Sequence, residues 1–73
     1  MNASSPDLSI VIPAYNEERR LPETLRRIRA YVEARTASAE VIVVDDGSSD
    51  RTAAFVEEHR PSFLGLRLVS NGR

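Results

Sequence analysis

The fold of this chain is decided by one stretch, Glu40-Val41-Ile42-Val43-Val44-Asp45-Asp46-Gly47-Ser48-Ser49-Asp50. Residues 40–45 carry an unbroken apolar run rich in β-branched side chains, which predicts a strand. Because apolar residues do not alternate with polar ones here, we expect a parallel strand that is covered on both faces. The acids, glycine and serines that follow are typical of a loop that leads into a capped helix.

Strands and helices alternate on either side of this stretch. Apolar runs predict two further strands, and apolar residues at helical spacing predict two helices. In chain order the elements are strand 8–13, helix 21–35, strand 40–45, helix 51–59 and strand 66–70. Pro13 is expected to stop the first strand, because proline cannot donate to a ladder. This alternation predicts an α/β fold, the βαβαβ half of a doubly wound parallel sheet, over 8–73, with residues 1–7 as a disordered lead-in.

The composition excludes several kinds of protein. With 73 residues the chain forms one domain at most. Cysteine is absent and there is one histidine, so a disulfide framework and a thiolate or histidine-rich metal site are excluded. The formal net charge of −1 disfavours a broad basic surface, and we expect no nucleic-acid partner. The sequence shows neither a membrane-spanning run nor a signal peptide, so we expect a cytoplasmic protein.

Two polar clusters, residues 14–18 and 45–50, follow the carboxyl ends of predicted strands, where parallel sheets bind their ligands. A GxGxxG turn is absent, and the absence of lysine excludes a Walker-type phosphate loop. Tyr15 offers a flat face on which a nucleobase can stack. Asp46 can accept the ring N–H that uracil and guanine carry, and Glu17 can accept from ribose or base donors. These side chains predict a nucleotide site, with uridine and guanosine both open.

Structural roles compete with binding at some of these positions. Tyr15, taken alone, is more often a packing residue, and Asn16 is expected to be a loop residue or the cap of a short turn. Asp50 is expected to cap the second helix rather than to bind a ligand. Asparagine should replace Asp50 at little cost, because both residues cap helices well. A binding site is favoured by the joint occurrence of the two clusters at two strand ends.

Two motifs in this order resemble one enzyme family. The first is Ile12-Pro13-Ala14-Tyr15-Asn16-Glu17-Glu18, and about thirty residues later comes Val43-Val44-Asp45-Asp46-Gly47-Ser48-Ser49-Asp50-Arg51-Thr52. From residue 8 to about 70 the chain looks like the amino-terminal part of the family 2 glycosyltransferases. It is most similar to the branch that transfers mannose or glucose to dolichyl or other polyprenyl phosphates. The resemblance implies a Rossmann-like GT-A fold that binds nucleotide sugars, here incomplete.

The resemblance also implies a site and its partners. The residues expected to bind the nucleotide sugar are Pro13, Ala14, Tyr15, Glu17, Val44 and Asp46. The donor would be a UDP- or GDP-sugar, transferred with inversion of the anomeric carbon. The acceptor of the full-length protein would be a lipid phosphate or a glycan, and a lipid acceptor would bring that protein to a membrane.

The chain departs from the family in one respect. Members carry a later Asp-x-Asp motif that holds a divalent metal, whereas this sequence has no aspartate after Asp50. We therefore expect Mg²⁺ or Mn²⁺ only in the full-length enzyme, and none bound by this chain. We expect no catalytic or metal-binding residue within the chain and no activity of the chain alone. It is interpreted as a truncated part of the domain.

The sequence is compatible in part with two other interpretations. One is a non-catalytic remnant that binds nucleotide weakly or not at all. The other is a receiver-type signalling domain, whose first strand often ends in paired aspartates like Asp45 and Asp46. A receiver also needs a phospho-accepting aspartate on a later strand and a lysine beyond it. This chain has neither, and its acid pair follows the second strand, so the receiver interpretation is disfavoured.

Overall fold

The computed structural model describes residues 6–35 and 38–71 and shows the predicted alternation of strands and helices. The elements are strand β1 (Leu8–Ala14), helix α1 (Leu21–Arg35), strand β2 (Ala39–Asp45), helix α2 (Thr52–His59), the 3₁₀ helix η1 (Arg60–Ser62) and strand β3 (Leu66–Ser70). The predicted elements agree with these bounds to within about one residue at each end. Residues 1–5 of the expected lead-in lie outside the described residues.

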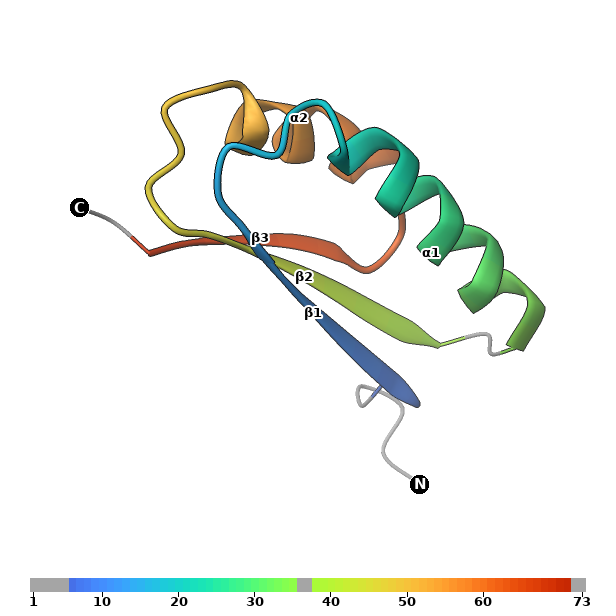
Figure 1. Cartoon of the computed structure of the whole chain (residues 1–73). Helices are drawn as coiled ribbons and strands as arrows, with labels where there is room; N and C mark the ends of the chain where they lie inside the picture. The colour runs from blue at the N-terminus through green and yellow to red at the C-terminus, as the bar shows by residue number, and fades with distance from the viewer. Residues whose placement is uncertain (1–5, 36–37, 72–73) are drawn as a thin grey trace.

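The three strands are parallel and lie in the order β1-β2-β3. Both crossovers step in the same direction, so right-handed connections place both helices on the same face of the sheet. Figure 1 shows α1 and α2 on this one side. The carboxyl ends of the strands meet at one edge, which we call the carboxyl rim. In the strand register, Ala14 lies opposite Asp45 and Asp45 lies opposite Ser70.

The hydrophobic core lies between the sheet and the two helices. Its buried members are Ala14, Leu21, Leu25, Val41, Val43, Val56, Phe63 and Leu66. The helical spacing that predicted α1 is confirmed by Leu21 and Leu25, which face the core. On the solvent side of the same helix, Glu23 forms ion pairs with Arg26 and Arg27. The helix therefore has one apolar and one charged face, and the apolar face fixes its position over the sheet.

The prediction that β2 is covered on both faces is wrong for the part of the chain that the structure describes. Val41 and Val43 are fully buried, but Ile42 and Val44 between them are only half-buried. On the flanking strands, Val11 is 60% exposed. Since both helices lie on one side, the other face of the sheet has no described element over it. We call this second face the uncovered face.

Pro13 does not stop β1, which continues to Ala14. The carbonyl oxygen of Ala14 accepts the N–H of Asp46 at 2.9 Å, so the backbone polar groups of Ala14 point towards β2. Because these groups alternate along a strand, those of Pro13 point to the open edge. A proline at such a position removes no hydrogen bond from the sheet. The strand therefore tolerates Pro13 where an interior strand would not.

Gly65 lies directly before β3 and packs tightly against the start of β2. Its φ is +89°, and a Cβ atom added to it would lie 2.3 Å from the carbonyl oxygen of Ala39. The carbonyl oxygen of Gly65 also accepts the N–H of Val41 at 2.9 Å, at the start of the β2–β3 ladder. Any other residue here would adopt a left-handed conformation and push the two strands apart.

We expect Gly65→Ala to lower the free energy of unfolding by about 3 kcal/mol, as the sum of backbone strain and overpacking. Urea denaturation followed by far-ultraviolet circular dichroism, at low protein concentration, measures this. The matched control is Leu64→Ala, since Leu64 is 94% exposed and its loss should change the unfolding free energy by less than about 0.5 kcal/mol. Equal effects of the two variants would contradict the steric argument.

Candidate functional site

Two loops meet at the carboxyl rim. We call residues 15–20, which follow β1, the β1 loop, and residues 46–51, which follow β2, the β2 loop. Asn16 N donates to Ser48 Oγ at 2.9 Å, and Ser49 N donates to Asn16 Oδ1 at 2.9 Å. Next to them, Asp46 N donates to Ala14 O at 2.9 Å. The predicted convergence of the two polar clusters is therefore confirmed.

The paired acids of the β2 loop have different environments. Asp45 is 6% exposed, and its Oδ1 accepts the N–H of Ser48, which folds the loop back over the strand end. Asp46 is less buried, and its Oδ1 accepts from Asn71 Nδ2 at 3.2 Å. Gly47, with a φ of 77°, makes the turn after the pair. Asp45 thus supports the loop, and Asp46 presents its carboxylate at the rim.

Asn16 contributes more to the contact between the two loops than the sequence indicated. Its φ is 52°, in the left-handed region that asparagine tolerates better than most residues. This conformation lets its N–H and its side-chain oxygen bond to neighbouring serines of the β2 loop, Ser48 and Ser49. An asparagine that directly follows a strand is a sequence signal for such a turn. Its partners Ser48 and Ser49 could not be predicted, because they lie more than thirty residues later in the chain.

The other predicted site residues occupy different parts of the rim. Pro13 and Val44 are register partners and, by strand alternation, lie on the uncovered face beside the rim. Tyr15 is 58% exposed. Glu17 is partly exposed, and its Oε1 lies 3.9 Å from Arg20 Nε. Ala14 is 3% exposed in the core and its carbonyl oxygen is bonded to Asp46 N, so its part in ligand binding stays a prediction.

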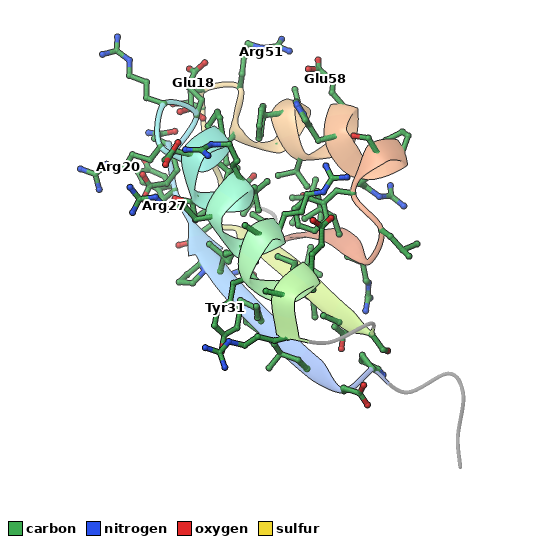
Figure 2. All side chains as sticks on the ribbon, turned by 90° about the vertical axis from the view of Figure 1, so that its right-hand side faces the viewer. Glu18, Arg20, Arg27, Tyr31, Arg51 and Glu58 are labelled. Carbon is green, nitrogen blue, oxygen red and sulfur yellow. The ribbon has the colours of Figure 1, made fainter. Side chains whose placement is uncertain are left out.

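The prediction that Asp50 caps α2 is wrong in its position, because the N-cap residue is Arg51, which makes no side-chain cap hydrogen bond. Asp50 lies one residue earlier and contacts both the start of α2 and the β1 loop. Its Oδ1 accepts the N–H of Thr52 at 2.9 Å, and its Oδ2 accepts the N–H of Glu18 at 3.2 Å. Burial raises the pKa of Asp50, but hydrogen bonds from the Thr52 hydroxyl, the Thr52 N–H and the Glu18 N–H together hold it below its ordinary value. Figure 2 shows Glu18 and Arg51, the neighbours of this contact, at the same end of the molecule.

Asn71 is a residue of the rim that the sequence analysis did not select. It follows β3, its N–H donates to Asp45 O at 2.8 Å, and its side chain reaches Asp46. The third strand therefore contributes to the same edge as the first two. The sequence could have indicated Asn71, because the carboxyl ends of parallel strands meet at one edge of the sheet and Asn71 directly follows the third strand.

The donor set does not fit a metal site within the described residues, which contain no group of three or more histidine, cysteine, aspartate or glutamate side chains able to share an ion. We therefore assign no metal ligand in residues 6–35 and 38–71. A hollow of about 510 Å³ lies at the other end of the sheet, near the end of α1 and the turn before β3, and none of the predicted site residues line it.

The sequence pattern of the family described as "Glycosyl transferase family 2" matches residues 9–73, most of the chain. The chain belongs to glycosyl transferase family 2. The family predicted from the two motifs is confirmed. Which residues of this family 2 chain bind a nucleotide sugar stays a prediction.

Curated relatives of the family 2 chain include sugar transferases named for lipid phosphates. The dolichyl-phosphate beta-glucosyltransferase ALG5D of Trichomonas vaginalis is 40% identical over 68 residues, covering 86% of this chain and 21% of the relative. The undecaprenyl-phosphate 4-deoxy-4-formamido-L-arabinose transferase of Sodalis glossinidius is 55% identical over 47 residues, covering 64% of this chain and 14% of the relative. The chain thus spans about a fifth or less of the length of these relatives.

A solved structure shows the same fold. The crystal structure of S. aureus TarS 1-349 matches the family 2 chain with a TM-score of 0.68 and 32% sequence identity, covering 86% of this chain and 18% of that chain. The α/β fold of the GT-A type is therefore confirmed, and the strands and helices described here form an incomplete part of it. Within residues 6–35 and 38–71, no helix is long and apolar enough to cross a bilayer.

Proposed function

We propose that this chain is the donor-nucleotide-binding part of an inverting glycosyltransferase, which transfers a sugar from a UDP- or GDP-sugar to a polyprenyl phosphate. The observation that carries the proposal is the meeting of the two loops that bear Tyr15, Glu17 and Asp46 at one rim, where Asp46 N donates to Ala14 O. The family membership and the lipid-phosphate transferases among the relatives support the reaction type.

Each of the proposed site residues is assigned a role in nucleotide binding that suits its functional group. The exposed ring of Tyr15 stacks on the base, which is worth about 1–3 kcal/mol by analogy with other base–aromatic contacts. Asp46 accepts the ring N–H of uracil or guanine in a charge-assisted hydrogen bond. Glu17 accepts from ribose hydroxyls or base donors. Pro13 and Val44 supply an apolar wall next to the base on the uncovered face.

The remaining parts of the reaction are assigned to the full-length protein. A divalent ion, Mg²⁺ or Mn²⁺, would neutralise charge on the sugar diphosphate, and we assign its ligands outside the residues described here. The lipid-phosphate acceptor is already an anion, so the attacking oxygen needs little help from a base. Such an acceptor would hold the full-length protein at a membrane surface.

We expect Asp46→Asn in the full-length protein to weaken binding of UDP or GDP by about 1.5–3 kcal/mol, the scale of a hydrogen bond to a charged group. This corresponds to a dissociation constant raised by about 10- to 160-fold. The matched control is Asp7→Asn, which makes the same change of charge next to the other end of β1. Isothermal titration calorimetry with each nucleotide measures both variants.

The titration also separates the interpretations. A tighter constant for one of the two nucleotides identifies the donor class. Equal losses for Asp46→Asn and Asp7→Asn would contradict the assignment of Asp46. No binding of either nucleotide at millimolar concentration by the wild-type protein would contradict the proposed function and favour the non-catalytic remnant.

A further inference from the structure

The β1 loop is anchored to the start of α2 by two backbone N–H groups. Glu17 N donates to Thr52 Oγ1 at 2.8 Å, and Glu18 N donates to Asp50 Oδ2 at 3.2 Å. These contacts join residues that lie more than thirty positions apart in the chain. They are separate from the contacts of Asn16 and Ala14 described above.

Asp50 and Thr52 act as one hydrogen-bonded unit, which we call the Asp50–Thr52 bracket. The hydroxyl of Thr52 accepts from Glu17 N and donates to Asp50 Oδ1. Asp50 Oδ1 also accepts the N–H of Thr52. Thr52 is fully buried, so water cannot substitute for these partners. Removing either side chain would leave a buried donor or acceptor unsatisfied, which is costly.

The bracket anchors the part of the β1 loop that bears Glu17, while other contacts anchor the part that bears Tyr15. Tyr15 lies between Ala14, bonded to Asp46, and Asn16, bonded to the serines of the β2 loop. Glu17 is held by its N–H at Thr52, and its carbonyl oxygen accepts the N–H of Leu21 at 2.8 Å, at the start of α1. The direction in which the Glu17 side chain leaves the backbone is therefore set by the bracket.

We propose that Asp50 and Thr52 are positioning residues for nucleotide binding, which hold the β1 loop so that Glu17 and Tyr15 face the same ligand as Asp46. This inference rests on the proposed function. Neither residue needs to touch the nucleotide. Their loss would weaken binding because the free loop would have to be ordered each time a nucleotide binds.

The geometry also corrects the expectation that asparagine could replace Asp50 at little cost. Both carboxylate oxygens of Asp50 act as acceptors, one for Thr52 and the other for Glu18 N. An asparagine has one side-chain oxygen, so its NH₂ group would face an N–H donor at one of the two places. An asparagine oxygen that faces Thr52 would keep the hydrogen bond at the start of α2, but the contact to the β1 loop would be lost.

The test uses the full-length protein with Asp50→Asn, Thr52→Val and Thr52→Ser. Valine keeps the shape of threonine without the hydroxyl, and serine keeps the hydroxyl. Two quantities are measured: the dissociation constants of UDP and GDP, and backbone amide hydrogen exchange by mass spectrometry in peptides that cover residues 14–20 and 40–45. The 40–45 peptide covers most of β2, so its exchange rate reports whether the sheet itself has been destabilised.

Asp50→Asn and Thr52→Val are expected to raise the dissociation constant of the bound nucleotide at least about fivefold. Exchange in the 14–20 peptide should become at least about tenfold faster, while exchange in the 40–45 peptide stays within about twofold of the wild type. Thr52→Ser, which keeps the hydroxyl, should leave both the dissociation constant and the exchange rate close to the wild-type values. If Thr52→Val fails to fold, Asp50→Asn gives the same comparison, because Asp50 is only partly buried.

Three results would overturn the inference. Unchanged nucleotide affinity in the variants of a protein that binds nucleotide would show that the bracket has no part in binding. Faster exchange in both peptides would show a general loss of stability. Absence of binding by the wild type would overturn the proposed function and this inference with it, while the exchange rates alone would still show whether the bracket holds the loop.

Discussion

The 73-residue chain, purified alone, is expected to transfer no sugar. Incubation with UDP- and GDP-sugars, Mn²⁺ and dolichyl or undecaprenyl phosphate should release no nucleotide above background. The sequence has no Asp-x-Asp motif, and its described residues contain no group of three potential metal ligands. Charge that develops on the leaving diphosphate therefore has no carboxylate-held cation beside it, and such assistance is worth several kcal/mol.

The positive control for this experiment is a longer relative assayed in the same mixtures. The dolichyl-phosphate beta-glucosyltransferase ALG5D of Trichomonas vaginalis, of which this chain covers 21%, serves as that control. Nucleotide release by the control and not by the 73-residue chain is the expected pair of results. Metal-dependent turnover by the 73-residue chain would show that it contains a complete site.

The second large effect concerns association of the chain with itself. Among the described residues β1 pairs only with β2, so its other edge presents unpaired N–H and C=O groups. Next to this edge lies the uncovered face, where Val11 is 60% exposed. Open apolar edges pair with other chains. At micromolar concentration we expect the isolated chain to elute from a size-exclusion column as oligomers or aggregates.

Val11→Lys should convert this material to a monomer, because a charge on an edge strand opposes pairing. The matched control is Leu64→Lys, which places the same charge on a 94% exposed apolar residue before β3 and should leave the elution unchanged. Equal rescue by both variants would mean that general solubility is the cause. A wild-type monomer that melts cooperatively above about 45 °C, as ordinary domains do, would contradict the expectation.

The order of strands and helices could be predicted because each element is specified by its own residues. The spacing of Leu21 and Leu25 predicts the buried face of α1 without reference to any other segment. The surroundings of a strand are not specified in this way. Ile42 and Val44 are as apolar as Val41 and Val43, and only the direction of the two crossovers decides which pair lies under the helices.

The same distinction applies to the site. Tyr15, Glu17 and Asp46 could be selected because their functional groups suit a nucleotide and because they follow strands. The hydrogen bond from Glu17 N to Thr52 Oγ1 could not be predicted, since it joins residues 35 positions apart and depends on how closely two loops pack. Asn71 was missed because the third strand was not followed to the rim where the other two end.

Pro13 has a consequence for any strand that would extend the sheet beyond β1. At the open edge Ser9 and Val11 each offer an N–H and a C=O, whereas Pro13 offers a C=O alone. An added strand would find both donors and acceptors along the first half of β1. At Pro13, next to the carboxyl rim, β1 would offer it an acceptor but no donor. The proline therefore weakens pairing at the end of this edge next to the carboxyl rim, and it leaves the first half of the edge open to another chain.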